Sequence, residues 1–191
     1  MGKHIQVTEV TKQKFIDVFC ELYQQKPIEK ITVQELTKLS GYNRSTFYQY
    51  FHDIYDLLEY IENDVLTYFR YTSSARLKNL HDQDLVIRKI AQLYDDKGDY
   101  LIALLGDYGS VRFLNKLSQV IDEHSEELGV YVSHLDSVLI PYIKTFFLST
   151  IISMFKCWYN NNKSITSEEL VTLIHNLISI ETILQKNVIE K

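Results

Sequence analysis

The sequence is poor in the residues that break helices, with two prolines and six glycines among 191 residues. An all-β protein of this length would need many tight turns, and glycine and proline are the residues that most favour such turns. The composition therefore argues against a β fold and predicts an all-α protein made of long helices.

Cysteine is also scarce, which argues against a disulfide-stabilised secreted fold. Cys20 and Cys157 lie far apart, each in an apolar stretch, and we expect both to be reduced. The first residues contain no apolar run of the kind found in secretory signals. The most apolar region, residues 138–159, contains Lys144 and Lys156, so it does not fit a membrane span of about 20 uncharged residues. We expect a cytoplasmic protein without a membrane partner.

Motifs of catalysis and metal binding are missing as well. Four histidines are scattered without the spacing of a metal site, namely His81, His124, His134 and His175. The sequence has no glycine-rich phosphate loop and no Gly-X-Ser-X-Gly nucleophile motif. We therefore expect neither an enzyme nor a protein that depends on a metal or cofactor.

The net charge of −5 argues at first against a nucleic-acid partner, but the charge is unevenly distributed. Residues 1–52 contain seven Lys/Arg against five Asp/Glu, whereas residues 53–191 contain thirteen against twenty. A DNA-binding protein needs positive charge only on the face that meets the phosphates. The asymmetry is small, so it permits DNA binding without establishing it.

Apolar residues recur with helical spacing along most of the chain. Phe15, Val18, Phe19 and Leu22, for example, form one stripe at positions i, i+3, i+4 and i+7. The predicted helices are nine, at about residues 8–24, 33–40, 44–51, 54–78, 83–96, 99–106, 111–127, 136–160 and 167–186.

Two short predicted helices are joined by a tight turn between residues 32 and 51. Thr32 and Glu35 have capping-box spacing at the start of the first helix, which we expect to bury Val33, Leu36 and Leu39. Gly41 stands where a helix end favours a left-handed residue. We expect Asn43 to cap the second helix, whose Phe47 and Phe51 point into the core.

The outer face of the second helix is polar, because burial of the two phenylalanines leaves the residues between them outside. Arginine pairs well with guanine and glutamine with adenine, and a threonine methyl can touch thymine. A helix-turn-helix is a common way to present such side chains to the major groove, although it also occurs as a packing unit. The side chains available for reading DNA are Arg44, Ser45, Thr46, Tyr48 and Gln49.

This region resembles the N-terminal domain of TetR-type transcriptional regulators. The matching stretches, within the first 60 residues, are KPIEKITV at 26–33, LSGYNRSTFY at 39–48, FHD at 51–53 and YDLL at 55–58. Weaker matches, at 104–106, 113–117, 146–147, 158 and 167–170, resemble the C-terminal domain of a Firmicutes-type branch that includes regulators of dihydroxyacetone kinase. The resemblance implies about nine helices, a homodimer and a C-terminal domain that often binds a small molecule.

The resemblance also implies roles for individual residues. Thr32 matches a residue that caps the first motif helix and touches a phosphate, and Tyr50 matches a position that faces the DNA backbone. Members often carry lysine at the positions of His52 and Ile54, and alanine at those of Thr37 and Ser40, so this chain departs from them at four places. The expected DNA-binding residues are Thr32, Asn43, Arg44, Ser45, Thr46, Tyr48, Gln49, Tyr50 and His52.

The rest of the chain is expected to supply the dimer interface and an effector site. The predicted helices at about 136–160 and 167–186 are apolar over wide arcs, which favours a four-helix interface between two subunits over an ordinary monomer core. Aromatic residues that could line an effector pocket, although such residues are more often plain core, are Tyr94, Tyr100, Phe113, Tyr131, Phe146 and Trp158.

These features predict two domains, a helix-turn-helix domain at residues 1–53 and a helical dimerisation and effector domain at 54–191. The predicted function is that of a repressor which binds a pseudo-palindromic operator as a homodimer and is released by a small molecule that shifts the helix at 54–78. The missing lysine at Ile54 and the acidic pI of about 5.7 keep one alternative open. It is a helical co-activator or interaction module that acts through a protein partner with weak or no DNA binding.

Overall fold

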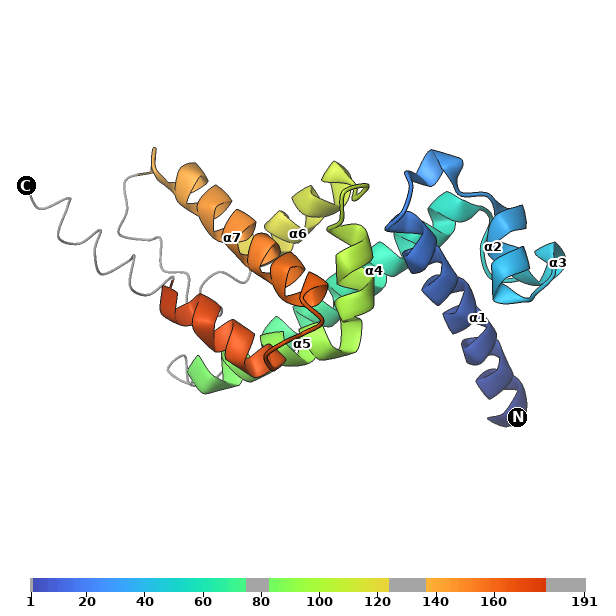
Figure 1. Ribbon diagram of the computed structural model, residues 1–191, viewed down its shortest axis with the longest axis horizontal. Helices are drawn as coiled ribbons and strands as arrows, with labels where there is room; N and C mark the ends of the chain where they lie inside the picture. Colours follow the sequence, from blue (N-terminus) through green and yellow to red (C-terminus); the bar gives the residue numbers. More distant parts are fainter. Residues whose placement is uncertain (1, 75–82, 124–136, 178–191) are drawn as a thin grey trace, which may run out of the picture. The chain divides into compact units, whose positions relative to one another are not determined.

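The structure, a computed structural model, describes residues 2–74, 83–123 and 137–177, and within these ranges it contains helices and no strand (Figure 1). This confirms the predicted all-α class. The helices are α1 (Gly2–Tyr23), the short 3-10 helix η1 (Ile28–Lys30), α2 (Val33–Ser40), α3 (Arg44–Phe47), α4 (Ile54–Ser74), α5 (Gln83–Leu104), α6 (Val111–Glu123) and α7 (Ile140–Asn160). A further helix begins at residue 167 and continues to residue 177.

The chain forms two compact units. The first comprises Met1–Thr67 and Asp99–Lys116, and the second comprises Tyr68–Gly98 and Leu117–Lys191. The predicted domain boundary at residue 53 rests on the motif and the family resemblance. The two compact units do not test that boundary, so it stays a prediction.

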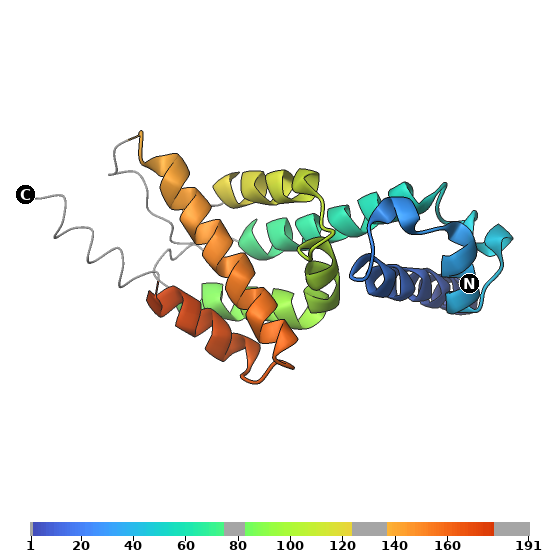
Figure 2. The same ribbon diagram turned by 45° about the horizontal axis from the view of Figure 1, so that its top comes forward.

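The core of the first unit is built around the apolar stripe of α1. Phe15 and Phe19 are fully buried, as are Leu36 of α2 and Leu57 and Ile61 of α4. Helix α1 contacts α2, and α2 in turn contacts α3, as the second view makes visible (Figure 2). The predicted stripe therefore becomes the platform on which the two motif helices are held.

Side-chain oxygens cap the starts of α2 and α4, and the cap of α2 is the predicted Thr32. Thr32 accepts a hydrogen bond from the backbone N–H of Glu35 at 3.2 Å, and Gly41 adopts a left-handed φ of 77° after α2. At the start of α4, Asp53 accepts from the backbone N–H of Asp56 at 2.8 Å, and Asp56 accepts from that of His52 at the same distance. These bonds satisfy backbone donors that a helix start leaves without partners.

Three predicted details of burial and helix bounds are wrong. Leu39, expected to be buried, is 57% exposed, because it lies at the edge of the buried face of α2, which Leu36, Thr37 and Ser40 form. Helix α3 ends at Phe47 rather than Phe51, and turns follow it.

The third error concerns α5. The predicted helices 83–96 and 99–106 are one helix, Gln83–Leu104, with Gly98 inside it. A glycine within a helix costs about 1 kcal/mol relative to alanine, and apolar residues buried on both sides of it offset that cost. Tyr94 and Leu101 are two of these.

In the second unit, α7 and the helix at 167–177 lie side by side and run in opposite directions in both views (Figures 1 and 2). The turn between them contains Asn162 and Lys163, both with positive φ. Trp158 donates its indole N–H to the carbonyl of Ile165 at 2.7 Å, which ties the turn to α7. The next helix starts at a capping box in which Thr166 and Glu169 exchange backbone-to-side-chain hydrogen bonds.

No helix in the part of the chain that the structure describes has the length and apolar character needed to cross a membrane.

Candidate nucleic-acid interface

Helix α3 is anchored from one side by aromatic packing. Phe47 is fully buried, and its ring meets that of Phe15 edge-on with centroids 5.5 Å apart. Phe51, just beyond the helix, is also buried and lies 5.6 Å from Phe47, centroid to centroid. Aromatic pairs at such centroid distances contribute about 1 kcal/mol beyond the area they bury. The inward side of this short element is therefore fixed, as the spacing of the two phenylalanines predicts.

The other side of α3 and the turn after it faces solvent. Arg44, Ser45, Tyr48 and Gln49 are exposed, with Tyr48 at 57%, and Thr46 and Tyr50 are half-buried. Polar and aromatic groups in this arrangement can donate to phosphates or to the edges of bases. The exposure agrees with the predicted orientation of the helix, and the individual DNA contacts stay predictions.

Two residues at the helix starts differ in their capping. The Thr32 hydroxyl accepts from the Glu35 backbone, so its own hydrogen remains available to donate. Asn43 occupies the capping position of α3 with an extended backbone, but its side chain makes no capping hydrogen bond. The predicted cap by the Asn43 side chain is therefore wrong, and the residue is exposed.

Arg44 is held by a residue of the first motif helix. Its Nη2 atom donates to Oε1 of Gln34 at 2.6 Å, and both residues are exposed. Gln34 was not among the predicted interface residues. The signal that could have identified it is its place two positions after the Thr32 cap, on the exposed side of α2.

The basic side chains around the motif differ in exposure and in whether an acidic side chain already pairs with them. Lys26 forms an ion pair with Glu35, with Nζ and Oε1 2.5 Å apart, while Lys30 and Lys38 are exposed. His52 is exposed, but Ile54 is buried at 5% exposure. The position where relatives often carry a lysine is thus part of the core here.

The two hydroxyl residues that replace common alanines are both buried in α2. Thr37 donates to the carbonyls of Val33 at 2.8 Å and Gln34 at 3.2 Å, and Ser40 donates to the carbonyl of Thr37 at 3.2 Å. Hydroxyls that bond back to their own helix in this way need no other partner. Both substitutions therefore fit inside the unit without leaving a buried donor unpaired.

The predicted effector residues are distributed over both units. Tyr94 and Trp158 lie with Phe155 in a buried aromatic cluster of the second unit, the rings of Tyr94 and Phe155 being 4.7 Å apart. Burial alone raises the pKa of Tyr94. Phe146 is exposed in that unit, and Tyr131 lies outside the described residues. The remaining two, Tyr100 and Phe113, are buried in the first unit.

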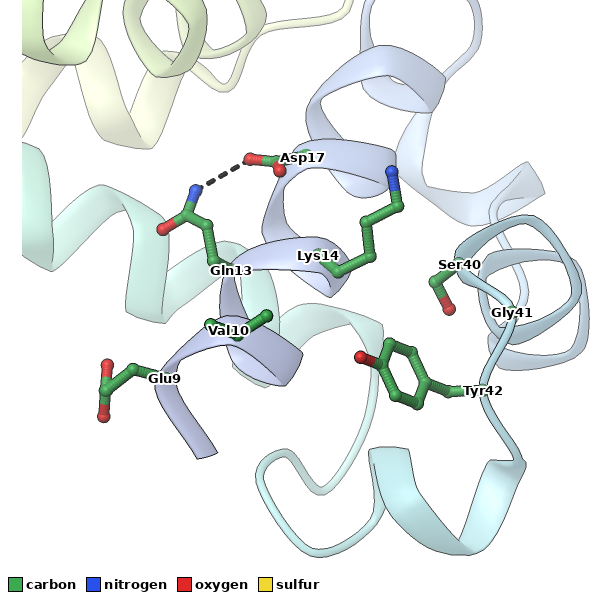
Figure 3. Close-up of a pocket in the computed structure, with 8 residues that line it drawn as sticks. All are labelled: Glu9, Val10, Gln13, Lys14, Asp17, Ser40, Gly41 and Tyr42. Atoms are coloured by element: carbon green, nitrogen blue, oxygen red, sulfur yellow. Dashed lines mark hydrogen bonds between the residues drawn. The ribbon is translucent and has the colours of Figure 1, made fainter. Parts of the chain in front are cut away.

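A groove of about 820 Å³ opens between α1 and the turn of the motif (Figure 3). None of the predicted effector residues lines it. Gln13 and Asp17 are hydrogen bonded along one wall at 2.7 Å, and Tyr42 lies on the other. Its walls carry charges of both signs, from Glu9, Lys14 and Asp17.

Two family models match the chain. Residues 15–61 match the model for bacterial regulatory proteins of the tetR family. Residues 81–180 match the model for a transcriptional regulator C-terminal region. Together the two matches include the helix-turn-helix and more than half of the chain.

Solved structures with the same fold include three regulators. The fatty acid degradation regulator FadR from Bacillus halodurans is 16% identical, with a TM-score of 0.63 over 88% of this chain and 94% of that one. A TetR transcriptional regulator from Streptococcus agalactiae is 21% identical, with a TM-score of 0.57 over 92% and 97%. The dihydroxyacetone kinase operon activator DhaS is 18% identical, with a TM-score of 0.53 over 90% and 96%. None of the curated proteins matches the chain.

Proposed function

The chain belongs to the TetR family of DNA-binding transcriptional regulators, and from that premise we propose that it is a homodimeric repressor released from its operator by a small molecule. The observation that carries the proposal is the two-sided character of α3. Phe47 fixes one side in the core, and Arg44, Ser45, Tyr48 and Gln49 stand exposed on the other.

Exposed apolar side chains support the homodimer. Tyr142 of α7 is 74% exposed, and Leu139 and Phe146 share its side of the helix at spacings of three and four residues. Leu173 and Leu177 are exposed on the adjoining helix, one turn apart. Large apolar side chains exposed on two neighbouring helices are typical of an interface. Two such helix pairs, one from each subunit, would form a four-helix interface.

A two-fold dimer makes a geometric demand on the DNA. It presents two copies of α3, which enter successive major grooves about 34–36 Å apart. The operator is therefore proposed to be pseudo-palindromic.

We propose the aromatic cluster of Tyr94, Phe155 and Trp158 as the effector region of the second unit, since apolar ligands bind among aromatic side chains with few polar groups. Residues of α4 belong to both units, which makes this helix the proposed route for the effector signal. An effector acts as a switch only if its affinity differs between the DNA-bound and free arrangements. Repression, rather than activation, is proposed by analogy with the family.

The test of DNA binding uses the full chain and a pool of random-sequence duplexes. We expect association that weakens steeply with salt, since each neutralised phosphate releases counterions. The double variant Arg44→Ala, Tyr48→Ala should lose binding and keep the dimer. The matched control, Arg88→Ala with Tyr108→Ala, removes the same residue types from exposed positions outside the helix-turn-helix and should bind normally. Absence of salt-dependent association would favour the co-activator alternative.

The test of the dimer is sedimentation of the double variant Tyr142→Glu, Phe146→Glu. Two carboxylates in an apolar interface should convert the dimer to a monomer, because an unpaired buried charge is strongly unfavourable. Val111→Glu changes an equally exposed apolar residue of the first unit and should leave the dimer intact. A dimer that survives both glutamates would place the interface elsewhere.

A further inference from the structure

The hydrogen bond between Arg44 and Gln34 joins the two helices of the motif through exposed side chains. Arg44 is the first residue of α3 and Gln34 is the second of α2. The distance of 2.6 Å between Nη2 and Oε1 is short, as expected when the donor carries a charge. The contact restrains a long side chain whose free end would otherwise sample many rotamers.

The direction of this bond decides which groups remain for a partner. A guanidinium has five N–H donors and no acceptor, so it must face the oxygen of the Gln34 amide rather than its nitrogen. The Gln34 oxygen then accepts from Arg44, and the NH₂ group of Gln34 points away from that bond. The pair therefore presents mainly donors, which are the remaining guanidinium N–H groups and the NH₂ group of Gln34.

The backbone that carries Gln34 is fixed in place. Thr32 caps α2 two residues earlier, and the carbonyl of Gln34 accepts a bond from the Thr37 hydroxyl. Lys26 and Glu35 neutralise one another beside it. Gln34 is thus a neutral side chain on a rigid helix start, suited to hold Arg44 without adding charge.

We propose that Gln34 is a specificity-determining residue that positions Arg44 and extends its donor edge, so that the pair selects two adjacent acceptors in the major groove. Guanine presents two acceptors there, N7 and O6, whereas adenine and cytosine present an amino donor. A thymine next to the guanine adds the acceptor O4, and a second guanine adds two more. The expected preference is guanine at the base facing Arg44, with guanine or thymine beside it. This inference rests on the proposed function, because it requires α3 to enter the major groove.

The test compares duplexes selected from a random library by the full-length protein and its variants. Gln34→Met keeps the length and helix propensity of the side chain but can neither accept nor donate. We expect it to bind with the same salt dependence as the parent and to lose selectivity by about tenfold at the guanine and its neighbour. Gln25→Met, an equivalent change at an exposed position before η1, should leave both properties unchanged.

A second variant separates the two roles of the amide. Gln34→Glu can still accept from Arg44 but has no N–H to donate. It should keep the guanine that Arg44 reads and replace the neighbouring acceptor base with adenine or cytosine, whose amino groups a carboxylate can accept. In the Arg44→Ala background, Gln34→Met should cause no further loss at the guanine, because a positioning residue acts through its partner.

The outcomes distinguish this inference from the proposed function. One outcome is that the parent selects a defined sequence and Gln34→Met selects the same sequence with equal or sharper discrimination. In that case Gln34 does not position Arg44, and the inference is overturned while the proposed function stands. If the parent shows no salt-dependent association with any duplex, the proposed function fails and the inference fails with it. Thermal unfolding of each variant should match that of the parent, since both side chains are exposed.

Discussion

The Nζ atom of Lys116 in α6 lies 2.9 Å from Oε2 of Glu62 in α4, and the Glu62 side chain is completely buried. Arg112, one turn earlier in α6, approaches the same oxygen to 3.4 Å. The other oxygen, Oε1, has no hydrogen-bond partner among the residues that the structure describes. When only one oxygen of a buried carboxylate has partners, the stability of the buried charge depends strongly on the cations beside it.

Lys116→Met should therefore destabilise the first unit by about 2 kcal/mol, less than a fully buried pair would lose because Lys116 is partly exposed and Arg112 remains. The double variant Glu62→Leu, Lys116→Met removes the uncompensated charge as well and should recover most of that loss. Urea unfolding followed by circular dichroism measures both. A double variant as unstable as Lys116→Met alone would contradict this account of the pair.

Substitutions of Thr32 can separate its role in folding from its proposed contact with a phosphate. Thr32→Ala removes the acceptor for the Glu35 N–H and should cost about 1 kcal/mol of stability. Thr32→Asp keeps the cap, since aspartate is at least as good a capping residue, but places a negative charge toward the DNA. We expect Thr32→Asp to unfold like the parent and to bind duplex DNA at least tenfold more weakly. Undiminished binding by this variant would remove Thr32 from the interface.

The two positions where relatives often carry lysine should respond in opposite ways to its restoration. His52 is exposed, so His52→Lys should tighten DNA binding and steepen the dependence of log K on log salt by about 0.9. Ile54 is buried, so Ile54→Lys should instead destabilise the unit by about 1–3 kcal/mol through lost packing and charge burial. Binding titrations over a salt series and urea unfolding measure the two effects. An Ile54→Lys protein of undiminished stability would contradict the burial argument.

The sequence was sufficient to predict features that depend on neighbouring residues. The Thr32 cap and the left-handed Gly41 are set by local chemistry, and both are present. The inward orientation of Phe47 follows from helical period alone, which assigns a side chain to a face without any knowledge of its partner. Residues in the same stretch also carry the family resemblance, and that resemblance allowed the overall fold to be predicted.

Features that depend on which helix lies opposite could not be predicted in the same way. Helical spacing assigns Leu39 to an apolar stripe, but only the position of α1 decides that this side of α2 remains uncovered. The bonds of Gln34 with Arg44 and of Glu62 with Lys116 join residues 10 and 54 positions apart. No local pattern encodes such pairs, because they arise from tertiary packing.

Tyr100 gives the first unit a predictable response to alkaline pH. Burial raises the pKa of Tyr100 to about 12, and a hydrogen bond from Gln13 at 2.6 Å offsets only part of this effect. Since the pKa of the folded state exceeds the ordinary value of 10, the neutral phenol is favoured by folding. The contribution of this neutral phenol to the free energy of unfolding is complete below pH 10 and is lost as the pH rises toward 12.

Tyr100→Phe, which cannot ionise, should therefore show a shallower loss of stability between pH 9 and about 12 than the parent. The two proteins should differ most in slope above pH 10, where the unfolded parent begins to release the phenolic proton. Urea midpoints measured across this range provide the comparison, and Tyr55→Phe, at an exposed position, is the control that should follow the parent. If Tyr100→Phe and the parent lose stability in parallel, ionisation of this phenol is not coupled to the folding of the unit.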